Sequence, residues 1–148
     1  MKYLVRFISG LFLVLVIVAG AAYAYLVPED KPAPVASDNT LINLDTGDII
    51  GYQNNLGVSI WRGVPFAQPP VGDLRWRAPR PPVSWQQPRQ MLEAGPDCAN
   101  QANNTSAEKN LINGSEDCLY LNVFAPANAK DLPVMFWIHG GANNGGTS

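Results

Sequence analysis

The sequence is poor in basic residues, in histidine and in cysteine, and each shortage excludes a class of function. Ten Lys and Arg stand against twelve Asp and Glu, for a formal charge of −2. They form no basic stripe that could neutralise the phosphates of a nucleic acid. One histidine, two cysteines and no C-x-x-C pair are too few ligands for a metal or redox centre. We therefore expect no nucleic-acid partner, no metal and no cofactor.

A nucleophile motif is also lacking. No G-x-S-x-G occurs in the sequence. The stretch Gly57-Val58-Ser59-Ile60-Trp61 matches the first glycine and the serine but has Trp61 where the second glycine is required. Without the strand–Ser–helix turn of that motif a hydrolase has no activated serine. The sequence has one histidine, His139, which precedes a glycine pair. These residues therefore cannot assemble a complete Ser–acid–His triad.

The longest apolar run lies at the N-terminus. Lys2 and Arg6 precede residues 7–27, which carry no charge, and a helix of that length would span about 30 Å, the thickness of a bilayer core. The A-x-A sequence Ala22-Tyr23-Ala24 leaves a secretory signal as the alternative. Residues 1–27 are thus predicted to be a transmembrane anchor or a signal peptide. Either way, the remainder is expected to be exported, periplasmic or extracellular, and secreted if cleaved near Ala24.

Residues 28–40 are predicted to be a polar linker. The stretch PEDKPAPVASDNT contains three prolines and little apolar surface, so it favours a semi-stiff spacer over a folded element. The folded domain is expected over residues 41–148. It should open with three short strands, at 41–44, 49–52 and 58–61, separated by turns at 45–48 and 54–55 and forming a small antiparallel sheet.

A proline-rich stretch follows over residues 62–85. Its six prolines exclude a continuous helix or a central strand. We expect it to lie extended over a larger body, anchored by large apolar side chains: Trp61, Phe66, Leu74, Trp76 and Trp85.

Cys98 and Cys118 are expected to form a disulfide, because both lie in the part predicted to be exported. A disulfide that closes a loop of about 20 residues lowers the conformational entropy of the unfolded chain, which in the entropic account stabilises the fold by roughly 3 kcal/mol. After the loop, residues 119–124 and 134–138 read as two strands. Their short connection predicts that they are antiparallel neighbours.

A glycine-rich loop, His139-Gly140-Gly141, follows the second of these strands. A nucleotide-binding loop is disfavoured there, because the stretch from Gly140 to Thr147 has Gly146 where the phosphate-binding lysine of G-x-x-x-x-G-K-[ST] is required.

Three stretches, in this order, resemble the type-B carboxylesterases, the family that also contains the cholinesterases. The second, EDCLYLNVFAP, is the most specific. The stretches are residues 62–70 with Gly72, Arg75-Trp76 and Pro79; residues 116–126; and residues 137–142.

The resemblance implies an α/β-hydrolase fold, here incomplete: the N-terminal small antiparallel sheet plus the first strands of the main sheet. It implies hydrolysis of a small-molecule ester by a Ser–acid–His triad. It also implies a Cys98–Cys118 disulfide and an Arg75–Glu116 salt bridge. The backbone N–H groups of Gly141 and Ala142 would form the oxyanion hole, and Gly140 would permit the turn.

The sequence stops within the predicted oxyanion loop, so the expectation is a truncated N-terminal portion that is inactive alone. The alternative is a membrane-tethered, esterase-like binding module without catalysis. The DNA beyond codon 148 discriminates the two: a G-x-S-x-G followed by an acid and a histidine indicates an enzyme, and a replaced serine indicates a binder.

Overall fold

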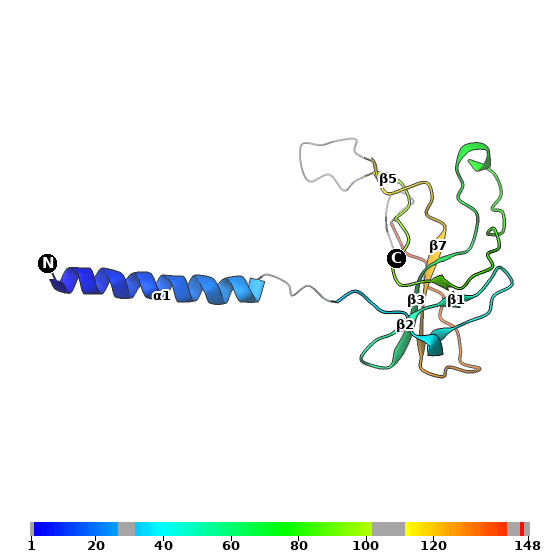
Figure 1. The fold of residues 1–148 in the computed structure, drawn as a ribbon. Helices are drawn as coiled ribbons and strands as arrows, with labels where there is room; N and C mark the ends of the chain where they lie inside the picture. The colour runs from blue at the N-terminus through cyan, green and yellow to red at the C-terminus, as the bar shows by residue number, and fades with distance from the viewer. Residues whose placement is uncertain (1, 27–31, 102–111, 142–145, 147–148) are drawn as a thin grey trace. The chain divides into compact units, whose positions relative to one another are not determined.

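The computed structural model describes residues 2–26, 32–101, 112–141 and 146. The chain divides into two compact units, Met1–Ala33 and Pro34–Ser148. The first contains helix α1 (Lys2–Leu26). Among its described residues, the second contains two 3-10 helices and seven strands: η1 (Asp38–Thr40), β1 (Ile49–Ile50), β2 (Tyr52–Gln53), β3 (Val58–Pro65), η2 (Gly72–Leu74), β4 (Arg89–Gln90), β5 (Asn100–Gln101), β6 (Ile112–Asn113) and β7 (Tyr120–Pro126). Figure 1 labels α1 and the strands β1, β2, β3, β5 and β7.

Helix α1 covers most of the apolar run expected at the N-terminus. Among the described residues, no helix is long and apolar enough to cross a membrane. The structure therefore does not support the membrane span predicted over residues 7–27.

The second unit begins before the expected boundary at residue 41. Within η1, Thr40 is only 2% exposed. Its hydroxyl donates to Ser37 O at 2.6 Å and accepts from Gly51 N at 2.9 Å. Trp61 Nε1 donates to Thr40 O at 2.8 Å. The end of the stretch expected to be a linker is thus hydrogen-bonded into the fold.

A three-stranded antiparallel sheet, in the order β2-β3-β7, forms the centre of the second unit. Strands β2 and β3 form the predicted hairpin, with Tyr52 opposite Ile60. Its turn is closed by Asn54, whose Oδ1 accepts from the backbone N–H groups of Leu56 and Val58 at 3.0 and 2.9 Å. Such Asx contacts are the reason why asparagine favours turns.

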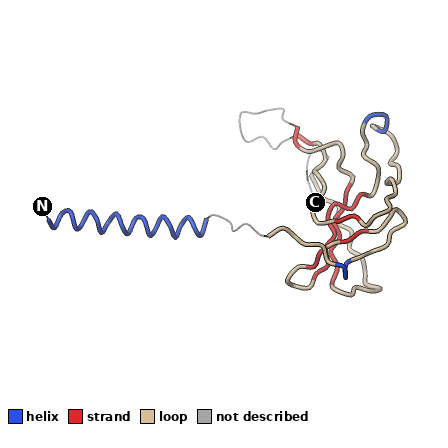
Figure 2. The backbone as a smooth tube through the Cα atoms, in the orientation of Figure 1, coloured by secondary structure: helices blue, strands red, loops and turns tan. Residues whose placement is uncertain are grey.

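Strands β3 and β7 pair from Val58 opposite Pro126 to Pro65 opposite Tyr120, and Figure 2 shows them running together through the middle of this unit. The register shifts between Trp61 and Val64, where Gly63 has a φ of 69°. Its N–H is held there by Asn122 Oδ1 at 3.1 Å. The bulge lets both ends of a long strand stay paired.

The predicted pairing of residues 119–124 with residues 134–138 is therefore wrong. The strand itself exists as β7, but its partner is β3. Residues 134–138 form no strand: Val134 and Met135 are 90% and 93% exposed, and Phe136, Trp137 and Ile138 are each 76% exposed. A strand with both faces apolar needs neighbours on each side, and no described segment pairs with this one.

The strand expected over residues 41–44 is reduced to one antiparallel bridge between Ile42 and Ile49. Strand β1 instead pairs in parallel with β4, with Ile49 opposite Arg89. This pairing could not be predicted from the sequence, because β4 is short and both of its side chains are exposed.

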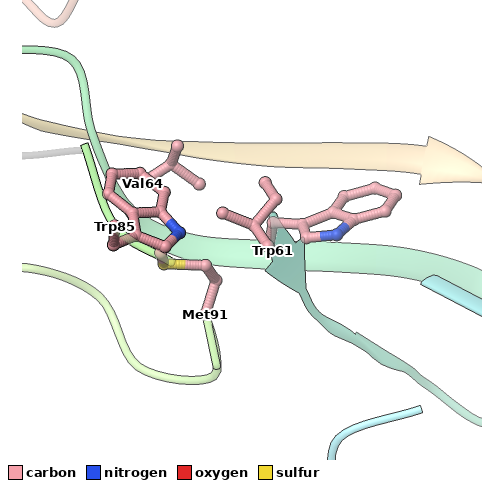
Figure 3. Packing of buried hydrophobic residues seen from close by; sticks show 5 residues of the cluster. Trp61, Val64, Trp85 and Met91 are labelled. Atoms are coloured by element: carbon pink, nitrogen blue, oxygen red, sulfur yellow. The ribbon is translucent and has the colours of Figure 1, made fainter. Parts of the chain in front are cut away.

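The core of the second unit is a small cluster in which Met91 and Val64 lie beside Trp85, as Figure 3 shows; its buried members are Ile49, Trp61, Val64, Trp85 and Met91. Two of the five expected anchors, Trp61 and Trp85, are buried in it. The anchor role predicted for Phe66 and Trp76 is wrong, since these side chains are 50% and 97% exposed. Trp76 lies in the turn after η2 at a φ of 58°.

Candidate functional site

The glycine-rich loop begins where the exposed segment 132–138 ends. Gly141 has a φ of 137°, in the region that only glycine enters without strain. Gly140 has an ordinary φ, and a Cβ there would meet nothing within 4 Å. Gly141, one of the two predicted oxyanion donors, thus has a backbone conformation that requires glycine. The other, Ala142, lies outside the described residues.

His139 and Gly146 meet at the peptide that joins Gly140 to Gly141. His139 Nδ1 lies 2.9 Å from Gly140 O. Gly146 has a φ of 116°, and a Cβ at this position would overlap both Gly140 O and His139 Nδ1. The two ends of the loop therefore approach each other closely around one carbonyl oxygen.

The predicted disulfide is confirmed. Cys98 and Cys118 are joined by an S–S bond of 2.09 Å, with their Cα atoms 4.9 Å apart. Next to it, Cys98 forms a parallel bridge with Ser115, and Gly114 passes so close to Cys98 O that a Cβ would lie 2.6 Å from it. The two ends of the loop are thus held by backbone contacts as well as by the disulfide.

The predicted salt bridge is confirmed as well. Arg75 Nε lies 2.8 Å from Glu116 Oε1, and the two side chains are 53% and 47% exposed. A half-exposed pair of this kind is worth about 0–1 kcal/mol. Its contribution is positional, because it links the turn after η2 to the segment that leads into β7.

An open depression of about 210 Å³ surrounds the disulfide and this ion pair. Its lining comes from the proline-rich stretch and the two ends of the closed loop: Pro70, Arg75, Trp76, Cys98, Ala99, Ser115, Glu116 and Cys118. None of these residues belongs to the glycine-rich loop. The depression is therefore not the place where the predicted oxyanion chemistry would occur.

Asp117 and Tyr120 form a polar pair that the sequence did not reveal. Tyr120 Oη donates to Asp117 Oδ1 at 2.8 Å. Burial raises the pKa of Tyr120 above its ordinary value of 10.0, and the hydrogen bond and the negative charge of Asp117 raise it further, while Arg89 opposes them. The tyrosine ring packs on Gly95, where a Cβ would collide with it. The only signal in the sequence is the spacing of three residues between the two.

A second missed contact holds the proline-rich stretch in place. The guanidinium of Arg89 lies 4.4 Å from the ring centroid of Trp85, within cation–π range. At the edge of the ring, Trp85 Nε1 donates to Asp48 O at 2.7 Å. The indole thus joins β4 to the turn before β1.

Comparison with known proteins gives one consistent family. The model of the carboxylesterase family matches residues 38–148. The chain is 43% identical over 104 residues to the para-nitrobenzyl esterase of Bacillus subtilis (strain 168), covering 69% of this chain and 21% of that protein. It is 46% identical over 105 residues to the fumonisin B1 esterase of Sphingopyxis macrogoltabida, covering 69% of this chain and 19% of that protein.

Solved structures agree. A PNB esterase superposes with a TM-score of 0.64 at 42% identity, covering 73% of this chain and 22% of that one. A carboxylesterase of Geobacillus stearothermophilus superposes with a TM-score of 0.62 at 38% identity, covering 72% of this chain and 21% of that one. These esterases have the α/β-hydrolase fold, to which the partial sheet seen here corresponds. The chain spans about a fifth of the length of the relatives that it matches.

Proposed function

The chain belongs to the carboxylesterase family, and from that membership we propose that the protein is a carboxylic ester hydrolase acting on a small-molecule ester. The relatives at 43% and 46% identity are both esterases by name. The observation that carries the proposal is the glycine-rich loop, in which Gly141 adopts a φ of 137°. Such a backbone brings its amide close to a ligand without a side chain in between.

The role proposed for the loop is that of an oxyanion hole. When an oxygen nucleophile attacks the ester carbonyl, the C=O π pair moves onto the oxygen, and the resulting anion then collapses and expels the alcohol. The N–H groups of Gly141 and Ala142 would donate to that anion, and each such donor stabilises the transition state by about 3–4 kcal/mol. Gly140 would provide the turn that brings the two amides together.

The nucleophile, acid and base are proposed to lie outside these 148 residues, since no G-x-S-x-G occurs among them. The chain of residues 1–148 by itself is therefore expected to turn over no ester. The purified 148-residue chain and the protein expressed with all coding sequence that follows codon 148 should be compared on p-nitrophenyl acetate. Turnover by the short chain would refute this assignment of parts.

A substitution tests the loop directly. Gly141→Pro removes one N–H and cannot adopt the observed φ, so kcat in the longer protein should fall about 100- to 1000-fold. Leu56→Ala, which changes an 81% exposed side chain at the hairpin turn, serves as the control. A Gly141→Pro protein that folds and retains its kcat would exclude an oxyanion role for this loop.

Export is the localisation that we propose. The Cys98–Cys118 disulfide supports it, because such bonds persist in the periplasm or outside the cell and are rare in a reducing cytosol. Alkylation of free thiols in freshly lysed cells tests this: protected cysteines are expected, and two alkylated cysteines would contradict export.

A further inference from the structure

The hydrogen bond between His139 and Gly140 fixes which ring nitrogen carries a proton. Gly140 O lies 2.9 Å from Nδ1, and a carbonyl oxygen can only accept. The ring nitrogen must therefore donate, so the proton of the neutral imidazole is on Nδ1, and Nε2 has the free lone pair.

The accepting oxygen belongs to the same peptide as the N–H of Gly141. That peptide is planar and trans, so its C=O and N–H point in opposite directions. A donor that holds Gly140 O in place therefore also sets the direction of the Gly141 N–H.

Packing alone does not hold this peptide, because Ile138, His139, Gly140 and Gly141 are all exposed. The close approach of Gly146 supplies the second restraint, since only a residue without a Cβ fits against Gly140 O and the His139 ring.

We infer that His139 is a positioning residue: its Nδ1–H holds the Gly140–Gly141 peptide so that the Gly141 N–H stays aimed at the developing oxyanion, and Gly146 leaves the space that this bond needs. The role of this hydrogen bond in catalysis rests on the proposed function, whereas the hydrogen bond itself does not depend on it. Donors that are oriented before the reaction are the ones that stabilise a transition state most.

The first test determines which ring nitrogen of His139 carries the proton. Within residues 1–148, His139 is the only histidine, so the 148-residue chain labelled with 15N-histidine gives one pair of ring nitrogens in a long-range 1H–15N spectrum. At a pH where the ring is neutral, we expect Nδ1 to appear as the protonated nitrogen. Gly146→Ala should lose this preference, and Gly140→Ala, whose Cβ meets nothing within 4 Å, should keep it. A proton on Nε2 in the unchanged protein, or an unaltered tautomer in a folded Gly146→Ala variant, overturns the inference.

The second test measures positioning in the longer, active protein. His139→Phe keeps a planar ring but cannot donate, so kcat should fall about two- to ten-fold, the value of one net hydrogen bond, with KM unchanged. A folded variant with unchanged kcat refutes the positioning role, even if Gly146→Ala fails to fold. The two proposals fail separately. A protein that hydrolyses no ester refutes the proposed function while the tautomer still decides the hydrogen bond, and an active esterase with the proton on Nε2 refutes the inference alone.

Discussion

Replacing Thr40 by valine should destabilise the folded unit, because the Thr40 hydroxyl connects the segment before the sheet to the sheet itself. It donates to Ser37 O at 2.6 Å and accepts from the N–H of Gly51 at 2.9 Å. Valine keeps the branched shape of threonine and removes only the polar atom. The hydrogen bond that the side chain of Trp61 donates from Nε1 to the backbone oxygen of Thr40 is unaffected.

The size of the effect follows from what each partner loses. The N–H of the buried Gly51 is left without an acceptor, which costs about 1–3 kcal/mol. Ser37 O still accepts from Thr40 N at 2.8 Å, so its loss is small. The new methyl group, buried in place of the hydroxyl, returns up to about 0.8 kcal/mol. The free energy of unfolding should therefore fall by about 1–2 kcal/mol.

Urea unfolding of the protein and its variants measures this change, and amide hydrogen exchange at Gly51 reports the same bond locally. Thr46→Val is the matched control, because Thr46 is half-buried and its hydroxyl makes no hydrogen bond in the described structure; its stability should change by less than about 0.5 kcal/mol. Equal stability of the two variants, or unchanged exchange at Gly51 in Thr40→Val, would show that the fold does not use residue 40 in this way.

Two further predictions concern the closed loop and the residues after it. Changing both Cys98 and Cys118 to alanine should lower the free energy of unfolding by about 3 kcal/mol, measured by urea unfolding against the oxidised protein; a loss below about 1 kcal/mol would contradict a cross-link that constrains the unfolded chain. The pKa of Tyr120 is raised above 10.0, chiefly by burial, so its contribution is fully present below pH 10 and is lost as the pH rises through the folded pKa. Stability should therefore decline at alkaline pH, with a smaller decline in Tyr120→Phe, and parallel profiles would refute the assignment.

The elements that the sequence predicted well are those decided by neighbouring residues. The hairpin of β2 and β3 depends on a turn whose asparagine, Asn54, contacts the backbone two and four residues later. The disulfide and the Arg75–Glu116 salt bridge join distant residues. The disulfide was expected because both cysteines lie in the part predicted to be exported, and the salt bridge was implied by the family resemblance alone.

The errors in strand pairing concern partners that are distant in the sequence. Residues 119–124 read correctly as a strand, yet a short connection only favours pairing with the next strand and does not dictate it. The partner, β3, ends more than fifty residues earlier, and it matches β7 through a bulge at Gly63 that Asn122 closes. The parallel pairing of β1 with β4 is of the same kind, because strands of two residues have no detectable period.

The first two signature stretches serve the assembly of the fold, whereas the third is the stretch for which we propose a chemical role. The first and the second lie against each other, since Val64 and Pro65 of β3 pair with Leu121 and Tyr120 of β7, and their side chains contribute to the core and the ion pair. Their presence is explained by folding alone. In the third stretch, Trp137 and Ile138 are exposed, and Gly141 after them has a φ of 137°. Backbone N–H groups that are oriented in advance stabilise the negative charge that develops in a transition state. The loop from His139 to Gly141 is therefore where substitutions should separate activity from stability.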